Sequence, residues 1–405
     1  MWGLLRLAVL AGVARSVLLS LLGSSRSVSP AEQLGGSMMT PDASNPHWVA
    51  LQAMILGMQR GKGCLSGGVG EETSEEGYTT LEMNDVAFGD GSPGTVTFTE
   101  FAGPVLKRLR ERSGISSEEY LSSFVQALNS TDEASQLIEF EANSKSPQRF
   151  FFSPDGRFMV KTQKESELSS LLRLLPAYAS HMEKHEESLI SRFVGIYRVT
   201  YPNPSKWSVS RPSSQVLVVT SNVFCTSSPI ERKYDLKGST VGRKAKLKST
   251  VGEESGEVAT KTVLKDLDLH EAPGKINLGR REKTRLLRAL EEDARLLSGL
   301  GLMDYSLLAG LQQPQRGGFS RFIRSALRAK DRDKGRNGWR WGYYRGKRQG
   351  EVWHMGVIDV LQAYNLKKEL ETLAKGVIHD KHSISAVPPP EYADRFLGFI
   401  DAHTE

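Results

Sequence analysis

Two short segments, Met303-Asp304-Tyr305-Ser306-Leu307-Leu308 and Val357-Ile358-Asp359-Val360-Leu361, indicate the fold of this chain. Each places one aspartate in an apolar run whose length is typical of a buried strand or turn in a mixed α/β core. A carboxylate at the edge of such a core is costly unless it meets a cation, a metal ion or a hydrogen-bond donor. A single aspartate of this kind most often caps a turn. Two of them, with the lone lysine Lys161 in a third apolar strand, form the minimum set for metal-assisted phosphoryl transfer.

The positive charge of the chain is concentrated in one segment. The 405 residues carry a net charge of +6, and 39% of them are hydrophobic, as is usual for a soluble protein. A chain of this length is long enough for one large two-lobed domain or two ordinary ones. Residues 316–348 contain twelve lysines or arginines and two aspartates, which predicts a surface for an anionic partner. The two cysteines, Cys64 and Cys225, form no disulfide framework or zinc spacing, which favours an intracellular compartment.

The first 80 residues are predicted to be a disordered or leader segment, 1–80. Residues 2–22 are apolar but interrupted by Arg6 and Arg15, unlike a secretory signal or a membrane span. A dispensable leader, an amphipathic surface segment and a targeting signal all remain open. Residues 23–80 are rich in Gly, Ser, Thr and Glu and predict a linker with one short helix at 47–59. We therefore expect the folded chain to begin near residue 81.

The hydrophobic pattern predicts an N-terminal lobe over 81–230 and a C-terminal lobe over 231–405. The first contains a strand at 95–99, helices at 101–112, 118–128 and 164–181, a hairpin at 149–162 and strands at 193–201 and 215–224. The second contains helices at 280–300, 362–373 and 392–400, a strand at 352–360 and a basic loop at about 312–350. Helices beside antiparallel strands indicate an α+β fold, with antiparallel sheets flanked by helices.

Three motifs, in this order, resemble those of the phosphatidylinositol phosphate kinase family. They are Lys-Tyr-Asp-Leu-Lys-Gly-Ser-Thr at 233–240, the 303–308 segment and Val-Ile-Asp-Val-Leu-Gln-Ala-Tyr at 357–364. The resemblance covers roughly residues 95–400 and implies a two-lobed, protein-kinase-like fold that uses ATP and Mg²⁺. It implies that Lys161 binds the nucleotide, that Asp304 orients an inositol hydroxyl and that Asp359 binds magnesium.

The same resemblance assigns further residues to the nucleotide and to the lipid. Ser144 and Ser146 match the phosphate loop, and Asn222 and Val223 match the hinge between lobes that meets adenine through its backbone. Lys237 and Arg243 are at positions where cations contact nucleotide or lipid phosphates. For these two residues, a solvated basic loop is an equal reading.

Residues 366–386 resemble the activation loop, which in this family selects the phosphoinositide. Glu371 is at a position where members that use phosphatidylinositol 4-phosphate carry glutamate, and Lys368 belongs to a lysine pair that addresses the membrane. Glu369 and Ala374 replace a second lysine and a tryptophan of those members. One lysine near an anionic surface contributes about 1 kcal/mol, so membrane docking is predicted to be weaker.

The largest departure from the family is Pro147, which replaces the glycine of a Ser-x-Ser-Gly phosphate loop. Proline has no N–H and a fixed φ, so one phosphate donor is lost. A charge-assisted hydrogen bond of this kind is worth about 1.5–3 kcal/mol, and its loss slows the reaction roughly tenfold to a hundredfold if it acts only in the transition state. Lys161, Asp304 and Asp359 are all retained.

Two functions follow from this resemblance. The first is a kinase that phosphorylates the 5-hydroxyl of phosphatidylinositol 4-phosphate, with an activity that Pro147 is expected to reduce. The second is a catalytically poor scaffold that binds active relatives, as a homodimer or heterodimer, and brings them to membranes. Both imply a cytoplasmic protein peripherally bound to a phosphoinositide membrane, with the plasma membrane as the first candidate. Nucleic-acid binding through the aromatic residues of the basic loop is not expected, because anionic lipid explains the same charge.

Overall fold

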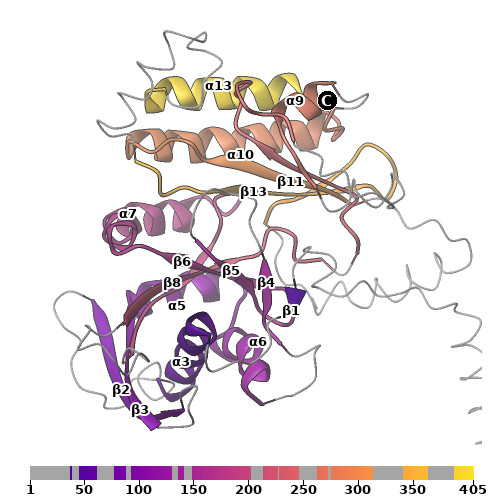
Figure 1. Cartoon of the computed structure of the whole chain (residues 1–405). Coiled ribbons are helices and arrows are strands. Elements are labelled where there is room, and N and C mark those ends of the chain that lie inside the picture. The colour runs from indigo at the N-terminus through magenta and orange to yellow at the C-terminus, as the bar shows by residue number, and fades with distance from the viewer. Residues whose placement is uncertain are drawn as a thin grey trace, which may run out of the picture.

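The computed structural model describes the chain in twelve stretches, which form two β-sheets surrounded by helices (Figure 1). They are residues 37–38, 45–61, 77–87, 93–129, 136–140, 148–201, 213–226, 228–245, 262–271, 275–312, 341–363 and 387–405. The predicted α+β class, with sheets flanked by helices, is confirmed. No helix in these stretches is long and apolar enough to cross a bilayer.

The N-terminal sheet has eight strands in the order β1-β4-β5-β6-β8-β7-β3-β2, and each neighbouring pair is antiparallel. The strands are β1 (Ser37–Met38), β2 (Tyr78–Ala87), β3 (Pro93–Phe101), β4 (Ile138–Phe140), β5 (Phe150–Phe152), β6 (Phe158–Gln163), β7 (Phe193–Tyr201) and β8 (Ser213–Ser221). The predicted hairpin is β5–β6. Its turn closes with the Gly156 N–H donating to the Ser153 carbonyl, and Gly156 takes a φ of +70° that suits glycine.

Both faces of this sheet are buried, because successive side chains of a strand point to opposite sides. In β8, Val216 and Val218 belong to a core shared with the C-terminal lobe, whereas Leu217 and Val219 belong to a separate outer core. Helices α3 (Pro46–Arg60) and α6 (Ser117–Asn129) cover the outer core. Helices α5 (Gly103–Arg112) and α7 (Glu165–Lys184) pack on the shared side (Figure 1).

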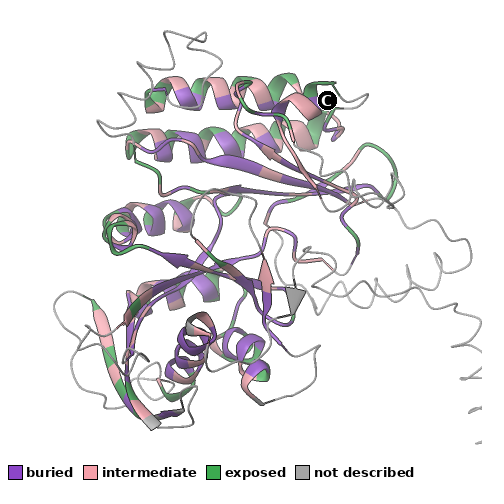
Figure 2. Ribbon diagram, in the orientation of Figure 1, coloured by how far each residue is buried: buried purple, intermediate pink, exposed green. Residues whose placement is uncertain are grey.

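Helix α3 differs from the prediction that the folded chain begins near residue 81. The short helix expected at 47–59 exists, but it is part of the N-terminal core, with Leu51, Met54 and Ile55 fully buried (Figure 2). Asn45 caps it by accepting a hydrogen bond from the His47 N–H. A composition averaged over residues 23–80 conceals this apolar helix between two polar stretches.

The C-terminal sheet has five strands in the order β10-β9-β11-β13-β12. They are β9 (Arg232–Leu236), β10 (Val263–Leu264), β11 (Ser306–Gln312), β12 (Tyr343–Arg345) and β13 (Val352–Ile358). Pairing is antiparallel except between β9 and β10, which run parallel. Strand β12 lies inside the segment predicted as a basic loop, and residues 313–340 of that loop lie outside the described residues.

Three helices complete the C-terminal lobe: α9 (Asp266–Glu271), α10 (Arg280–Gly299) and α13 (Pro389–Ala402). Helices α10 and α13 lie side by side, with their buried sides toward the sheet (Figures 1 and 2). Helix α7 packs from the other side, so one continuous core includes α7, α10, α13 and the central strands. The predicted helices at 280–300 and 392–400 are confirmed, whereas the helix expected at 362–373 lies outside the described residues.

Candidate active site

The antiparallel pairing of β11 with β13 brings Asp304 and Asp359 to the same end of the C-terminal sheet. Ser306 at the start of β11 pairs with Ile358 at the end of β13, so each aspartate lies one or two residues beyond the last pair. The segment before β11 and the segment after β13 meet again where the Met303 N–H donates to the Gln362 carbonyl at 2.9 Å. The aspartates thus lie in a short opening of the backbone that is closed at both ends.

Both aspartates adopt a left-handed backbone conformation, with φ of 64° at Asp304 and 60° at Asp359. Ala102 is the other non-glycine residue with positive φ among the residues described. This region is uncommon for residues other than glycine, although aspartate tolerates it better than most. Such conformations cluster at functional sites, where the surrounding structure enforces them.

Lys161 joins the two lobes at this site. It is in the middle of β6, and its Nζ lies 3.1 Å from the Asp359 Oδ1, although the two residues are 198 positions apart in the sequence. The Asp359 side chain is 52% exposed, so this carboxylate is accessible to solvent. The Lys161 ammonium also lies 5.2 Å from the centre of the Phe150 ring, a cation–π distance. The lysine and one aspartate singled out from the sequence therefore meet in the structure.

Lys237 pairs with the other aspartate, because its Nζ donates to the Asp304 Oδ1 at 2.8 Å. Its backbone is held by Asp266, which has no exposed surface and accepts from the N–H groups of Lys237 and Gly238 at 2.9 and 2.7 Å. Gly238 has a φ of +71°, and a β-carbon there would lie 2.9 Å from the Arg395 carbonyl oxygen. The turn that presents Lys237 therefore requires both a buried carboxylate and a glycine.

Arg243 is buried behind this turn. Its Nε donates to the Asp266 Oδ2 at 2.6 Å, and its Nη2 lies 3.2 Å from the Asp235 Oδ1. Burial alone would lower the pKa of Arg243, but the two carboxylates together raise it above its usual value, so the guanidinium is charged. The sequence suggested a direct contact with phosphate. In this structure its guanidinium is engaged with Asp235 and with Asp266, and Asp266 also accepts from the Lys237 N–H.

Asn222 and Val223 are in the connection between β8 and β9, the segment that the sequence predicted to be a hinge. The Asn222 Nδ2 donates to the Gly156 carbonyl at 2.7 Å, which ties the hinge to the β5–β6 turn. A β-carbon on Gly356 would lie 2.7 Å from the Val223 side chain, and one on Gly310 would lie 2.5 Å from the Phe224 ring. Glycines in β11 and β13 thus let the hinge pack directly on the C-terminal sheet.

Several predicted site residues lie outside the described part of the chain. They are Ser144, Ser146 and Pro147 of the phosphate loop and Lys368 and Glu371 of the 366–386 segment. Their roles remain predictions from the sequence.

The single exposed carboxylate of Asp359 is a ligand of the kind that Mg²⁺ uses in phosphotransfer sites. Mg²⁺ in phosphotransfer sites is usually held by one or two carboxylates, substrate phosphates and water rather than by an all-protein cage. Within the twelve described stretches, no three Asp, Glu, His or Cys side chains form a metal-binding group. The exposed Asp359 carboxylate beside the Lys161 ammonium suits a metal that arrives with a nucleotide.

Asp266 is a residue whose role the sequence did not reveal. The segment Lys-Asp-Leu-Asp at 265–268 contains two aspartates, and nothing in their spacing says that one is fully buried and the other is not. Asp268 instead accepts from the backbone N–H groups of Lys265 and Ala245, each at 2.9 Å.

Comparison with known proteins agrees with these motifs. The family described as phosphatidylinositol-4-phosphate 5-kinase matches residues 131–403. The chain is 32% identical over 321 residues to the human phosphatidylinositol 4-phosphate 5-kinase-like protein 1, covering 75% of each chain. It is 30% identical over 307 residues to phosphatidylinositol 4-phosphate 5-kinase 5 of Arabidopsis thaliana, covering 65% of this chain and 38% of that protein.

Other relatives are much longer than the matched region. A probable phosphatidylinositol phosphate kinase of Dictyostelium discoideum is 29% identical over 365 residues, which is 78% of this chain and 48% of that protein. The chain therefore spans less than half the length of these plant and amoeba relatives.

Proposed function

Because this chain belongs to the phosphatidylinositol phosphate kinase family, we propose that it transfers the γ-phosphate of ATP to the 5-hydroxyl of phosphatidylinositol 4-phosphate. The product is phosphatidylinositol 4,5-bisphosphate. The observation that carries this proposal is the 3.1 Å contact of Lys161 with Asp359 across the two lobes. Relatives named 4-phosphate 5-kinases support the choice of lipid and of hydroxyl.

Each residue has a role that its position supports. The Lys161 ammonium exchanges its contact with Asp359 for the phosphate oxygens of the nucleotide, whose negative charge it neutralises. The Asp304 carboxylate accepts a hydrogen bond from the attacking inositol hydroxyl and takes up its proton. Lys237, whose Nζ lies 2.8 Å from that carboxylate, would bind a phosphate of the incoming lipid. Arg243 acts indirectly, by fixing Asp266 under the Lys237 turn.

The exposed Asp359 carboxylate could hold a metal ion that would arrive with ATP. Asp359 is the residue that would hold Mg²⁺, and a bound Mg²⁺ neutralises charge on the transferred phosphoryl group. Ser144 and Ser146 would contact the nucleotide phosphates. The Asn222–Val223 hinge would contact the adenine through its backbone.

Membrane contact follows from charge. Twelve basic residues between 316 and 348 and Lys368 would bind anionic lipid headgroups, and Glu371 would favour the 4-phosphate lipid. On this proposal the protein acts as a cytoplasmic, peripheral-membrane kinase, with the plasma membrane as the expected site.

A second candidate is a catalytically poor scaffold that dimerises with active relatives. Pro147 favours it, because a proline in the phosphate loop removes one N–H donor. Glu369 and Ala374 favour it as well, since they remove a cation and an interfacial aromatic from the membrane contact.

Radiolabelled phosphate transfer to vesicles separates the two candidates. Vesicles with phosphatidylinositol 4-phosphate are compared with vesicles that contain the 5-phosphate or no phosphoinositide. Wild type is compared with Asp359→Ala, Pro147→Gly and a control, Asp401→Ala. Asp401 is exposed, lies on the last turn of α13 and pairs with Lys283 of α10, so replacing it should leave transfer unchanged.

The kinase proposal predicts transfer to the 4-phosphate lipid by wild type and none by Asp359→Ala. Pro147→Gly should then raise the rate by roughly tenfold to a hundredfold. Wild-type transfer no greater than that of Asp359→Ala, with transfer restored by Pro147→Gly, would reject the kinase and leave the scaffold. Vesicle binding that is unchanged when the arginines of 316–348 are neutralised would exclude this segment as the membrane contact.

A further inference from the structure

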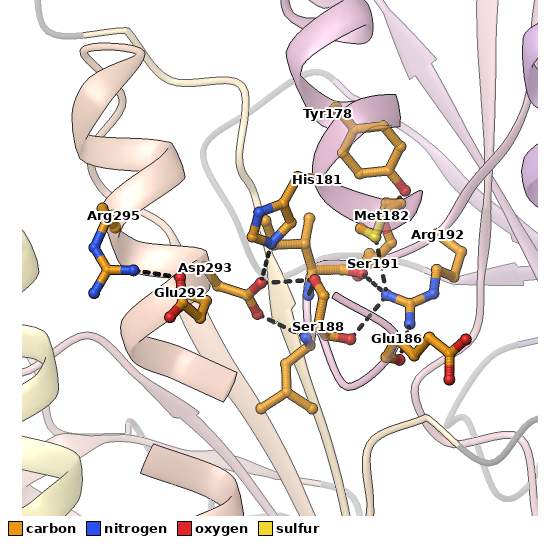
Figure 3. A network of polar contacts seen from close by, with 12 residues as sticks. Tyr178, His181, Met182, Glu186, Ser188, Ser191, Arg192, Glu292, Asp293 and Arg295 are labelled. Carbon is orange, nitrogen blue, oxygen red and sulfur yellow. Dashed lines mark hydrogen bonds and ion pairs between the residues drawn. The ribbon is translucent and has the colours of Figure 1, made fainter. Parts of the chain in front are cut away.

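A buried carboxylate on α10 joins the two lobes next to the candidate active site. Asp293 is 1% exposed and accepts three hydrogen bonds. His181 Nε2 of α7 lies 2.7 Å from its Oδ1, the Ser188 hydroxyl donates to the same oxygen at 2.6 Å, and the Leu189 N–H donates to its Oδ2 at 2.6 Å (Figure 3). Nothing in the proposed chemistry uses Asp293 directly.

The segment held by Asp293 runs from Ser188 to Arg192 and is called the strap here. It lies along the edge of β13 that β12 does not pair with beyond His354, and Ile190 is bridged to Val357 in parallel. The Val357 N–H donates to the Leu189 carbonyl at 2.7 Å, and the Val357 carbonyl accepts from the Ser191 N–H at 2.9 Å. The Ser191 hydroxyl donates to the same carbonyl at 3.1 Å. Both backbone groups of Val357 are therefore bonded to the strap.

Arg192 completes the strap from its other end. Its Nη1 donates to the carbonyls of Ser188 and Ile190 at 2.8 and 3.0 Å, and its guanidinium lies 4.9 Å from the centre of the Trp341 ring. Figure 3 shows Arg192 and Asp293 approaching the strap from opposite sides. A buried anion binds the strap N–H and hydroxyl groups, and a buried cation binds its carbonyls. Such a fully bonded segment is rigid.

The strap fixes the end of β13 from which Asp359 projects. Val357 is two residues before Asp359, and the positive φ at Asp359 follows directly after the strand ends. The Asp293 carboxylate also binds His181 of α7. Helix α7 begins two residues after β6, the strand that contains Lys161. Asp293 is therefore hydrogen-bonded to the strap, which lies beside the strand before Asp359, and to α7, which follows the strand of Lys161.

We propose that Asp293 is a positioning residue: through the strap it holds Asp359 in place for metal and nucleotide opposite Lys161. This inference rests on the proposed function. Residues that hydrogen-bond a metal ligand directly commonly change metal affinity by about 10–100-fold when they are removed. Asp293 acts one link further away, through the strap, so we expect the lower end of this range.

The test uses the full-length protein and two readouts. Hydrogen exchange of the peptides that contain Val357 and Ser191 reports the strap bonds without any ligand. The Mg²⁺ concentration for half-maximal binding of a fluorescent ATP analogue reports the position of Asp359. Three variants are compared with wild type: Asp293→Leu, Asp293→Asn and Leu290→Ala. Leu290 is one turn earlier on α10 and fully buried, so its truncation weakens the same core without removing a strap hydrogen bond.

Asp293→Leu should speed exchange at Val357 and Ser191 by about tenfold and raise the half-saturating Mg²⁺ concentration by about tenfold or more. Asp293→Asn should stay close to wild type in both, because its amide oxygen still accepts from Leu189 and its NH₂ can donate to the Ser188 oxygen and to His181 Nε2 in the tautomer that accepts there. Leu290→Ala should leave the Mg²⁺ dependence unchanged.

Unchanged exchange in Asp293→Leu would overturn the inference, and so would faster exchange with unchanged Mg²⁺ dependence. An equal shift in Leu290→Ala would also overturn it, because general loosening would then suffice. If Asp293→Leu does not fold, Ser191→Ala replaces it and should move both readouts in the same direction. Wild-type binding that needs no Mg²⁺ would reject the proposed function, while the exchange readout would still decide whether Asp293 holds the strap.

Discussion

Replacing Asp266 with asparagine should break the ion pair behind the Lys237 turn while keeping the turn's backbone bonds. The Oδ1 that accepts from Lys237 and Gly238 can remain an amide oxygen. The Oδ2 that faces the Arg243 Nε at 2.6 Å becomes an NH₂ group, which has no acceptor to offer. The change is therefore confined to one contact of a fully buried side chain.

The expected loss is large because the pair is buried. Removing one partner of a buried ion pair costs about 3–5 kcal/mol, since the other charge is left without compensation. Arg243 retains Asp235 at 3.2 Å, so we take the lower end, about 3 kcal/mol. For a chain of 405 residues, an unfolding entropy of about 2.1 cal/mol/K per residue makes 1 kcal/mol correspond to about 1.2 °C of melting temperature, which gives a decrease of about 3–4 °C.

Urea and thermal unfolding of the full-length protein measure this loss, with Asp268→Asn as the matched control. Asp268 is on the same helix and accepts from two backbone N–H groups with one oxygen, which asparagine can reproduce. Its substitution should cost less than about 0.5 kcal/mol. The difference should persist in 1 M salt, because buried charges are weakly screened. A difference below about 1 kcal/mol between the two variants would refute the claim that the Asp266–Arg243 pair supports the turn.

Three other perturbations test separate features. Burial lowers the pKa of His354 from 6.5 to about 4, so between these values the unfolded chain binds a proton that the folded protein does not. The free energy of unfolding should therefore fall by about 2 kcal/mol between pH 7 and pH 5, and His354→Gln should remove this part of the pH dependence in urea titrations. Gly238→Ala should destabilise by about 2 kcal/mol or more, because it adds a clash to a strained φ, whereas Gly242→Ala has the same strain (φ +70°) and open space and should cost about 1 kcal/mol; equal urea midpoints would contradict this. Lys161→Met should weaken ATP binding by about tenfold or more in calorimetry and leave stability nearly unchanged, since its partner Asp359 is half exposed; unchanged affinity would exclude Lys161 from the nucleotide site.

The pattern of the chain predicted most elements where one face is apolar and the caps are explicit. Ser116 and Glu119 predicted the start of α6, and the structure shows both reciprocal bonds of the capping box. Helix α3 was placed correctly but assigned to a disordered segment. Its tertiary contacts with α6 and the N-terminal sheet order it, and these cannot be read from local composition.

The charged pairs of the site were only partly predictable. Lys161, Asp304 and Asp359 stand out because each interrupts an apolar run, and the structure brings Lys161 to Asp359. Asp293 gave a similar signal, since it falls on the apolar face of α10 between Leu290 and Leu297. The sequence alone does not say which donors such a carboxylate meets, because they come from α7 and the strap, more than 100 positions away.

The backbone at Asp304 and Asp359 bears on the choice between kinase and scaffold. Each residue is held in a left-handed conformation that costs of order 1 kcal/mol or more for a non-glycine residue. Both residues lie just beyond the paired residues of β11 and β13, and a lysine faces each carboxylate. A docking surface requires neither the strain nor two closely paired lysines, whereas phosphoryl transfer requires carboxylates and cations at fixed positions. The geometry therefore favours the kinase, and the choice depends on whether Pro147 still lets the phosphate loop hold the nucleotide against them.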